Sequence, residues 1–196
     1  MKESRNLAMP ALSCLFAALI SVGAYIAVPL PGTPVPIVFQ NFFVMLAALL
    51  LGPAWALVSV LLYLCLGAFG LPVFAGGMGG FARFLGPTGG YLIGYIPAVL
   101  VMGFISRLGA ERRWWRDAFA VVAGCAVVYA CGLPWLRIVI KGSWEKAILG
   151  GLIPFLPGDA IKTVLAFFIA GRLAPLTERL SPRRRAASND QGSRRG

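Results

Sequence analysis

The sequence predicts an all-α, polytopic membrane protein with six transmembrane helices. Of its 196 residues, 59% are hydrophobic and 13% are charged, and the mean hydropathy is +0.81. This composition is typical of membrane proteins and not of soluble domains. Residues 6–82 contain no Asp, Glu, Lys or Arg, and a soluble domain could not cover so long an apolar run with a polar exterior. Several helices of about 20 residues are therefore expected to cross the bilayer within it.

The basic residues gather at predicted helix ends and in the tails. A formal net charge of +11 would suggest a nucleic-acid partner in a soluble protein, but most cations lie at residues 2–5, 107–116 and 172–195. Lys and Arg collect in this way on the cytoplasmic side of membrane proteins. No aromatic residues alternate with the arginines of the tail, so no nucleic-acid partner is expected. An even number of helices places both termini in the cytoplasm of a protein of the bacterial cell (inner) membrane, in contact with lipid.

The first half of the chain is expected to form three helices. The first covers residues 7–28, and the dense prolines that follow it exclude a helix from the extracytoplasmic connection. The second helix covers residues 37–51 and carries Gln40 and Asn41 near its outer end. The third covers residues 54–69.

A Gly-rich segment, residues 70–88, connects the third and fourth helices on the outer side. Irregular backbone near membrane depth is tolerated only where protein buries it or where it lines a cavity, so we expect it to form a wall or lid of a ligand pocket. The remaining helices are expected at residues 89–105, 118–135 and 157–173. An amphipathic piece is expected at residues 144–152, in the outer loop before the last helix. Residues 1–175 would form the transmembrane substrate-binding domain, and residues 176–196 a basic, disordered cytoplasmic tail.

Small residues form one face of the first helix. Ser13, Ala17 and Ser21 stand four positions apart, and such a face lets another helix approach closely in a membrane. The face can serve either internal packing or the docking of a partner subunit, and the sequence leaves both readings open.

Asp159 and Lys162 place charges inside the last predicted helix. Their i, i+3 spacing points both side chains to one face, and each intramembrane charge costs about 2.5 to 3.5 kcal/mol unless it faces a protein interior or a watery cavity. With Arg83 from the Gly-rich segment they would give a pocket one acid and two bases, which suit a ligand with N–H groups and a carboxylate. The alternative is that Asp159 caps the helix and Lys162 snorkels to the membrane surface.

The sequence lacks the residues that catalysis or metal binding would need. The chain has no His, and its four cysteines lie in apolar segments without CxxC spacing. We therefore expect no enzymatic activity, no metal and no cofactor. The chain also lacks a Gly-x4-Gly-Lys-Ser/Thr phosphate loop, so the energy for uptake against a gradient would come from other subunits.

Two separated motifs resemble the BioY family, the substrate-binding S components of biotin transporters of the energy-coupling factor (ECF) type. The first motif reads Pro-Val-Phe-Ala at 72–75, Gly-Gly-Phe at 79–81 and Gly-Pro-Thr-Gly-Gly-Tyr at 86–91, and the second reads Pro-Phe-Leu-Pro-Gly-Asp-Ala-Ile-Lys at 154–162. The resemblance covers residues 7–173. It implies a six-helix protein that captures biotin at the outer face and assembles with a transmembrane coupling subunit and ATPase subunits. The small face of the first helix is the expected coupling contact.

The resemblance also implies roles for the site residues. Asp159 would accept the ureido N–H groups of biotin, and Lys162 with Arg83 would bind its carboxylate. The walls for the bicyclic rings would be Phe74, Phe81 and Tyr91.

A second ureido contact is less evident from the resemblance. Some members use an amide side chain in the loop after the third helix, but residues 71–88 contain no Asn or Gln. Gln40 and Asn41 are the candidate substitutes. Two other functions remain as alternatives, an S component for another small vitamin and an intramembrane enzyme.

Overall fold

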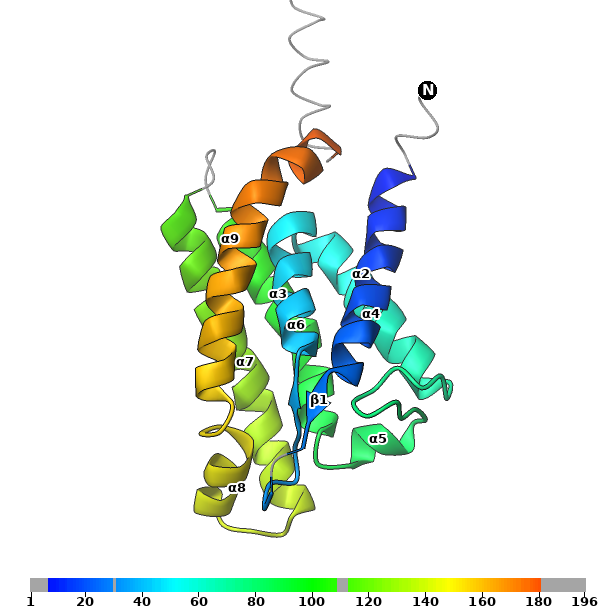
Figure 1. The fold of residues 1–196 in the computed structure, drawn as a ribbon, viewed down its shortest axis with the longest axis vertical. Coiled ribbons are helices and arrows are strands. Elements are labelled where there is room, and N and C mark those ends of the chain that lie inside the picture. The colour runs from blue at the N-terminus through cyan, green and yellow to red at the C-terminus, as the bar shows by residue number, and fades with distance from the viewer. Residues whose placement is uncertain (1–6, 30, 109–112, 181–196) are drawn as a thin grey trace, which may run out of the picture.

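Long helices form a bundle, and the shorter elements gather at one end of it (Figure 1). The computed structural model describes residues 7–29, 31–108 and 113–180. The long helices are α2 (Ala8–Tyr25), α3 (Gln40–Leu51), α4 (Pro53–Ala68), α6 (Gly89–Ser106), α7 (Trp114–Val139) and α9 (Leu156–Leu180). The short elements are strands β1 (Ala27–Val28) and β2 (Ile37–Val38) and helices α5 (Ala82–Leu85) and α8 (Trp144–Gly151). We call the end of the bundle that holds the short elements the hairpin end.

Four helices, α2, α6, α7 and α9, are long and apolar enough to cross a membrane. The other two long elements, α3 and α4, are also apolar but have 12 and 16 residues, which at about 1.5 Å per residue is less than the ~30 Å of a bilayer core. The outward face of α9 is strongly apolar, with Ile161 63% and Phe168 64% exposed. Such a surface is stable against lipid tails and not against water, as expected for a multi-pass membrane protein.

The predicted C-terminal end of the first helix and the predicted N-terminal end of the second were wrong. Residues 27–28 and 37–38 leave their helices and pair as antiparallel strands, with Ala27 opposite Val38 and Val28 opposite Ile37. β-Branched residues fit a strand well, and the proline-rich connection between the strands prevents either helix from continuing. The fold is therefore mostly helical with one short hairpin, and not purely α.

Two later helices are longer than predicted. Helix α7 begins at Trp114 and ends at Val139, so Arg137, which we expected in the outer loop, lies in its last turn. Helix α9 continues through Pro175 to Leu180, which makes residues 176–180 of the predicted tail helical. Residues 181–196 lie outside the described residues. The short helix α8 agrees with the amphipathic piece predicted at 144–152.

The turn between α3 and α4 follows directly from its residues. Gly52 has φ +78°, which favours glycine, and Pro53 occupies the first position of α4, where its missing N–H is not needed. The Arg107 Nη2 donates to the Leu50 carbonyl oxygen at 3.0 Å and places a cation at the C-terminus of α3, which the helix dipole favours.

Glycines allow the helices to approach closely. A Cβ atom added at Gly90 of α6 would lie 2.3 Å from the Trp135 Cβ and 2.7 Å from the Cys131 carbonyl oxygen of α7. Nearer the other end of α6, a Cβ added at Gly103 would lie 2.5 Å from the backbone nitrogen of Pro53. Helices in membranes commonly associate through such small residues, so larger side chains at these positions would separate the helices.

Two of the three small residues on this face of α2 pack inside the protein. Ser13 is fully buried and its Oγ donates to the Trp55 carbonyl oxygen of α4 at 3.1 Å, while Ala17 is 3% exposed. The Ser21 Oγ donates to the Ala17 carbonyl oxygen within α2, at 2.8 Å. Ser13 and Ala17 therefore serve internal packing, whereas Ser21 is half-buried, and the docking of a coupling subunit on this face stays a prediction.

Replacing Gly103 by Ala should destabilise the bundle, whereas the same change at Gly171 should not. The Gly103→Ala methyl would meet the backbone of Pro53, and forcing α6 away from this turn should cost about 1–3 kcal/mol. Gly171 lies on the exposed side of α9 with nothing within 4 Å of an added Cβ, and alanine there favours the helix. The apparent melting temperatures of the two variants in detergent measure this difference, and equal values would contradict the close contact at Gly103.

Candidate functional site

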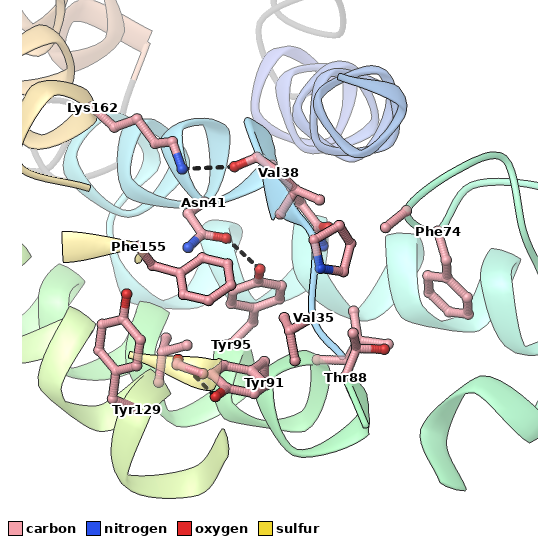
Figure 2. A pocket seen from close by; sticks show the side chains of 16 residues that line it. Val35, Val38, Asn41, Phe74, Thr88, Tyr91, Tyr95, Tyr129, Phe155 and Lys162 are labelled. Atoms are coloured by element: carbon pink, nitrogen blue, oxygen red, sulfur yellow. Dashed lines mark hydrogen bonds between the residues drawn. The ribbon is translucent and has the colours of Figure 1, made fainter. Parts of the chain in front are cut away.

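A cavity lies near the hairpin end of the bundle (Figure 2). Residues of α3, α6, α7, α8 and α9 line it, together with the hairpin and Phe74 of the Gly-rich segment. Most of its lining is apolar or aromatic. The polar lining groups are Gln40, Asn41, Thr88, Tyr91, Tyr95, Tyr129 and Lys162.

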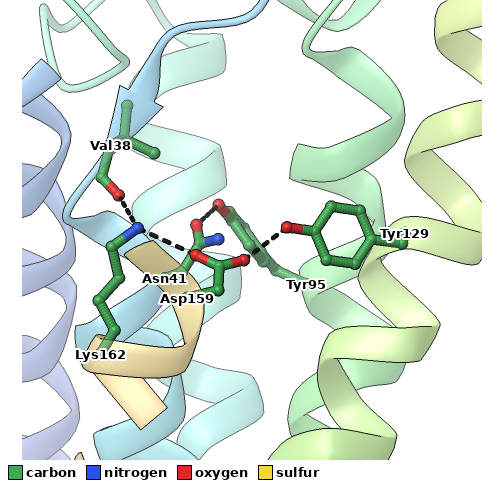
Figure 3. Close-up of polar contacts among 6 residues, drawn as sticks. All are labelled: Val38, Asn41, Tyr95, Tyr129, Asp159 and Lys162. Atoms are coloured by element: carbon green, nitrogen blue, oxygen red, sulfur yellow. Dashed lines mark hydrogen bonds and ion pairs between the residues drawn. The ribbon is translucent and has the colours of Figure 1, made fainter. Parts of the chain in front are cut away.

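Asp159 and Lys162 form a buried ion pair beside this cavity (Figure 3). The Lys162 Nζ lies 3.0 Å from the Asp159 Oδ1 and also donates to the Val38 carbonyl oxygen of β2 at 2.7 Å. The Tyr129 hydroxyl of α7 donates to the other carboxylate oxygen, Oδ2, at 2.6 Å. Lys162 is 5% exposed, so the snorkelling alternative is wrong. Each charge has polar partners, which is the condition for burying it.

The sequence of α9 explains why this pair points inward. Asp159, Lys162, Ala166 and Ala170 stand three or four positions apart and are all buried, because this spacing follows one face of a helix. The two alanines let α9 lie close to its neighbours below the charges. The positions between them carry large apolar side chains that face outward, namely Ile161, Val164, Leu165 and Phe168.

Asn41 and Tyr95 form a second polar contact at the cavity. The Tyr95 hydroxyl donates to the Asn41 Oδ1 at 2.5 Å. Both residues also line a smaller adjacent cavity of about 250 Å³, to which Asp159 and Tyr129 contribute. Asp159 therefore faces the smaller cavity while Lys162 faces the larger one, and the polar groups lie between the two spaces.

Glycines hold Tyr91 in place as one wall of the cavity. Its hydroxyl donates to the Gly151 carbonyl oxygen at 2.9 Å. Its ring packs against the backbone at Gly132, where an added Cβ atom would lie 2.4 Å from the ring. The ring meets that of Tyr129 edge to face, with 6.2 Å between centroids. Tyr91 is thus fixed by α7 and α8, and its predicted position at the cavity agrees with the lining.

Phe74 is held at the cavity by its aromatic neighbours. It is 2% exposed and packs edge to face on Tyr63 and Phe84, with 5.5 Å between centroids in both pairs. Gly67 makes room for the ring, since a Cβ there would lie 2.1 Å from it. The Gly-rich segment thereby supplies one deep aromatic ring to the site.

Two predicted site residues lie apart from the cavity lining. Arg83 is on α5 and half-buried, and Phe81 is 67% exposed next to Phe84, with 5.7 Å between ring centroids. Neither residue lines the cavity. Arg83 is therefore not part of the lining to which Lys162 contributes, and its role at the site stays a prediction.

Sequence reasoning missed Tyr95, Tyr129 and Phe155, all of which line the cavity. The sequence does contain a signal for Tyr95, because Tyr91 and Tyr95 stand at i, i+4 and share one face of α6. Two phenol hydroxyl groups on one face of a largely apolar helix indicate a polar partner nearby.

The arrangement suits a small ligand with a polar head and an apolar body. It offers a carboxylate, an ammonium group and an amide within aromatic walls, the combination typical of binding pockets. Among the described residues no three His, Cys, Asp or Glu side chains lie close enough together to hold a metal ion.

Comparisons with known proteins agree on one family. The model of the BioY family matches residues 1–179. The probable biotin transporter BioY of Pyrococcus horikoshii and the biotin transporter BioY of Thermotoga maritima are each 43% identical over 162 residues, which cover 83% of this chain and 93% of the relative. A crystal structure of the S-component for biotin from an ECF-type ABC transporter superposes with a TM-score of 0.82 at 33% identity, covering 88% of this chain and 94% of that one.

Replacing one residue of the ion pair should destabilise the protein more than replacing both. Asp159→Leu or Lys162→Met leaves one buried charge without its partner, whereas the double variant leaves none. In the ligand-free protein we expect a coupling free energy of about 1–3 kcal/mol between the two positions. Denaturation of the four proteins in detergent measures it, and strictly additive losses would show that the pair is not coupled.

Proposed function

This chain belongs to the BioY family, and we infer that it is the substrate-binding S component of an ECF-type transporter, which captures biotin for uptake. The observation that carries this inference is the fold of a biotin S component across 88% of the chain. The buried Asp159–Lys162 pair beside a cavity with aromatic walls supports it. An S component is a transport subunit and has no enzymatic reaction of its own.

Asp159 and Lys162 bind the same end of biotin in the arrangement we propose. Their charged atoms are 3.0 Å apart, whereas the ureido ring and the carboxylate stand at opposite ends of the ligand, separated by the whole pentanoate chain. The carboxylate of Asp159 keeps lone pairs for a ureido N–H, and Lys162 keeps one of its three ammonium protons for the ureido oxygen. This revises the role of Lys162 that the resemblance implied.

The rest of the ligand points from the ion pair toward the mouth of the cavity. Phe74 and Tyr91 pack against the bicyclic rings, and Arg83 on α5 is the cation of the Gly-rich segment that attracts the carboxylate. Phe81 lies on the exposed side of the same segment and covers the mouth when the ligand is bound.

The membrane arrangement follows from the positions of the charges. We propose that α2, α3, α4, α6, α7 and α9 all span the bilayer, with the Gly-rich segment on the outer side. The first residue of α2 and the last of α9 lie at the end of the bundle opposite the hairpin (Figure 1). Arg107, Arg113, Arg116 and Arg172 belong to that end, which the positive-inside rule places in the cytoplasm of the bacterial cell. The cavity then opens outward, and the apolar helix faces contact lipid.

Energy for uptake comes from other proteins. The sequence lacks a phosphate loop, so ATPase subunits and a transmembrane coupling subunit complete the transporter. Nucleic acid is not a partner, because the basic residues serve membrane orientation.

The purified chain should bind biotin, and the ion pair should be required for it. Lys162→Ala and Asp159→Asn each remove a charged hydrogen-bonding group from the ureido end, so we expect affinity to fall about 100-fold or more. The matched control is Lys146→Ala, because this lysine is exposed on α8. Calorimetry in detergent measures all four proteins. Unchanged affinity in Lys162→Ala, or displacement of biotin by an unrelated vitamin, would refute the assignment.

A further inference from the structure

Helix α8 carries an exposed apolar stripe that the proposed function does not use. Trp144 is 48% exposed, and Ile148, one turn further along the helix, is also exposed. The other face of α8 packs into the protein through Ala147, Gly150 and Gly151, which are buried. Neither Trp144 nor Ile148 lines the ligand cavity. The helix lies at the hairpin end of the bundle, beside the last turns of α7 (Figure 1).

The surroundings of α8 favour contact with the membrane surface. Tryptophan gathers at the interface between membrane and water, because its ring is apolar while its N–H needs a polar partner. The chain connects α8 to the outer ends of α7 and α9, and both helices have apolar outward faces, with Ile138 69% and Ile161 63% exposed. A short helix with an apolar stripe at this depth is expected to lie in the plane of the membrane surface.

Two cations lie close to Trp144 in the structure or in the chain. The guanidinium carbon of Arg137 is 4.7 Å from the centroid of the Trp144 ring, and this stacking leaves the N–H groups at the guanidinium edge free to bind an anion. Lys141 is exposed in the connection between α7 and α8, residues 140–143. In the described part of the chain neither cation forms an ion pair. Glu145 is the one acidic residue within residues 137–153.

Lys141 has a backbone conformation that suits glycine better. Its φ is +49°, and among the described residues no other side-chain-bearing residue has a positive φ. Helices often end with a glycine in this conformation, and Gly142 follows at the next position, where its N–H donates to the Arg137 carbonyl oxygen at 3.3 Å. A lysine in the left-handed region is less stable than a glycine. Its presence there indicates a use for the ammonium group.

Neither the helix dipole nor the membrane orientation accounts for this cluster. The dipole favours a cation in the last turn of α7, but the effect is small at an exposed position and is screened by salt. The positive-inside rule places few Lys and Arg in the short loops of the outer side. Two unpaired cations next to an exposed tryptophan on that side therefore indicate an anionic partner at the membrane surface.

We propose that Arg137, Lys141 and Trp144 bind the headgroup region of an anionic phospholipid in the outer half of the bilayer. Arg137 and Lys141 bind the phosphate, and Trp144 with Ile148 packs against the upper part of the acyl chains. A zwitterionic lipid such as phosphatidylcholine also carries a phosphate, but its own ammonium group is repelled by the two cations. This proposal goes beyond the capture of biotin and depends only on the outward orientation of the hairpin end.

Lys146 provides a matched control for the charge. It is an exposed lysine of the same helix, but it stands two positions after Trp144, so its side chain points to the opposite side of α8. Lys141→Gln and Lys146→Gln remove the same charge from the same end of the protein. Only the first should change the binding of a lipid at Trp144.

Quenching of tryptophan fluorescence by brominated lipids tests the proposal on the full chain in nanodiscs of phosphatidylcholine. Either brominated phosphatidylglycerol or brominated phosphatidylcholine is added in increasing amounts, and subtraction of the Trp144→Phe signal isolates the contribution of Trp144. We expect half-maximal quenching of Trp144 at an about fivefold or more smaller fraction of the anionic lipid. This preference should fall in about 1 M salt, because exposed charges are then screened.

The variants should separate the charge from the position of the ring. Lys141→Gln leaves Arg137 stacked on Trp144, and we expect it to reduce the preference for the anionic lipid about two- to fivefold. The double variant Arg137→Gln/Lys141→Gln should quench nearly equally with both lipids. Lys146→Gln should retain the preference of the wild type.

Three results would overturn the proposal. They are no quenching of Trp144 by either lipid, equal quenching by both lipids in the wild type, and an equal loss of preference in Lys141→Gln and Lys146→Gln. Slower association of biotin with the double variant, without any lipid preference in the wild type, would assign the cations to attraction of the ligand carboxylate instead. None of these results bears on whether the chain binds biotin, which calorimetry tests separately.

Discussion

The ion pair between Asp159 and Lys162 is the constraint on which the site depends. Two opposite charges inside a membrane domain are stable only when both have polar partners and neither faces lipid. The i, i+3 spacing on α9 brings the charges to 3.0 Å, and β2 and α7 supply the remaining partners. The hairpin, α7 and α9 are therefore fixed relative to one another by a single polar cluster. The ligand cavity lies where these three elements meet α3 and α6.

Capture of biotin follows from the contrast between this cluster and its surroundings. In the arrangement we propose, apolar and aromatic walls bury the ring system through the hydrophobic effect but give little orientation. The few polar groups supply the orientation, because they lie close together at one side of the cavity. A ligand with its N–H and C=O groups at one end and its charge at the other thus enters in one direction. The hydrogen bond from Lys162 to the Val38 carbonyl oxygen also ties the hairpin to the ion pair.

The sequence predicted the features that depend on composition and on spacing within one helix. These include the apolar helices, the shared face of Asp159 and Lys162, and the amphipathic piece that forms α8. Prediction from the sequence failed where packing between distant segments decides which side chains reach the cavity. The small residues of α2 mark a close helix contact in either reading, and the partner of Ser13, the Trp55 carbonyl oxygen, could not be read from the sequence. Arg83 and Phe81 share a segment with Phe74, yet neither of them lines the cavity, while Gly67 leaves room for the Phe74 ring. Tyr129 was missed because its partner Asp159 lies 30 residues away in the sequence.

An experimental structure of the chain with biotin bound would test the central claim most directly. The account predicts that the ureido ring lies against the Asp159–Lys162 pair, which stays intact, with the carboxylate toward the mouth of the cavity. A ligand bound in the reverse direction, with its carboxylate on Lys162, or bound outside this cavity, would contradict it.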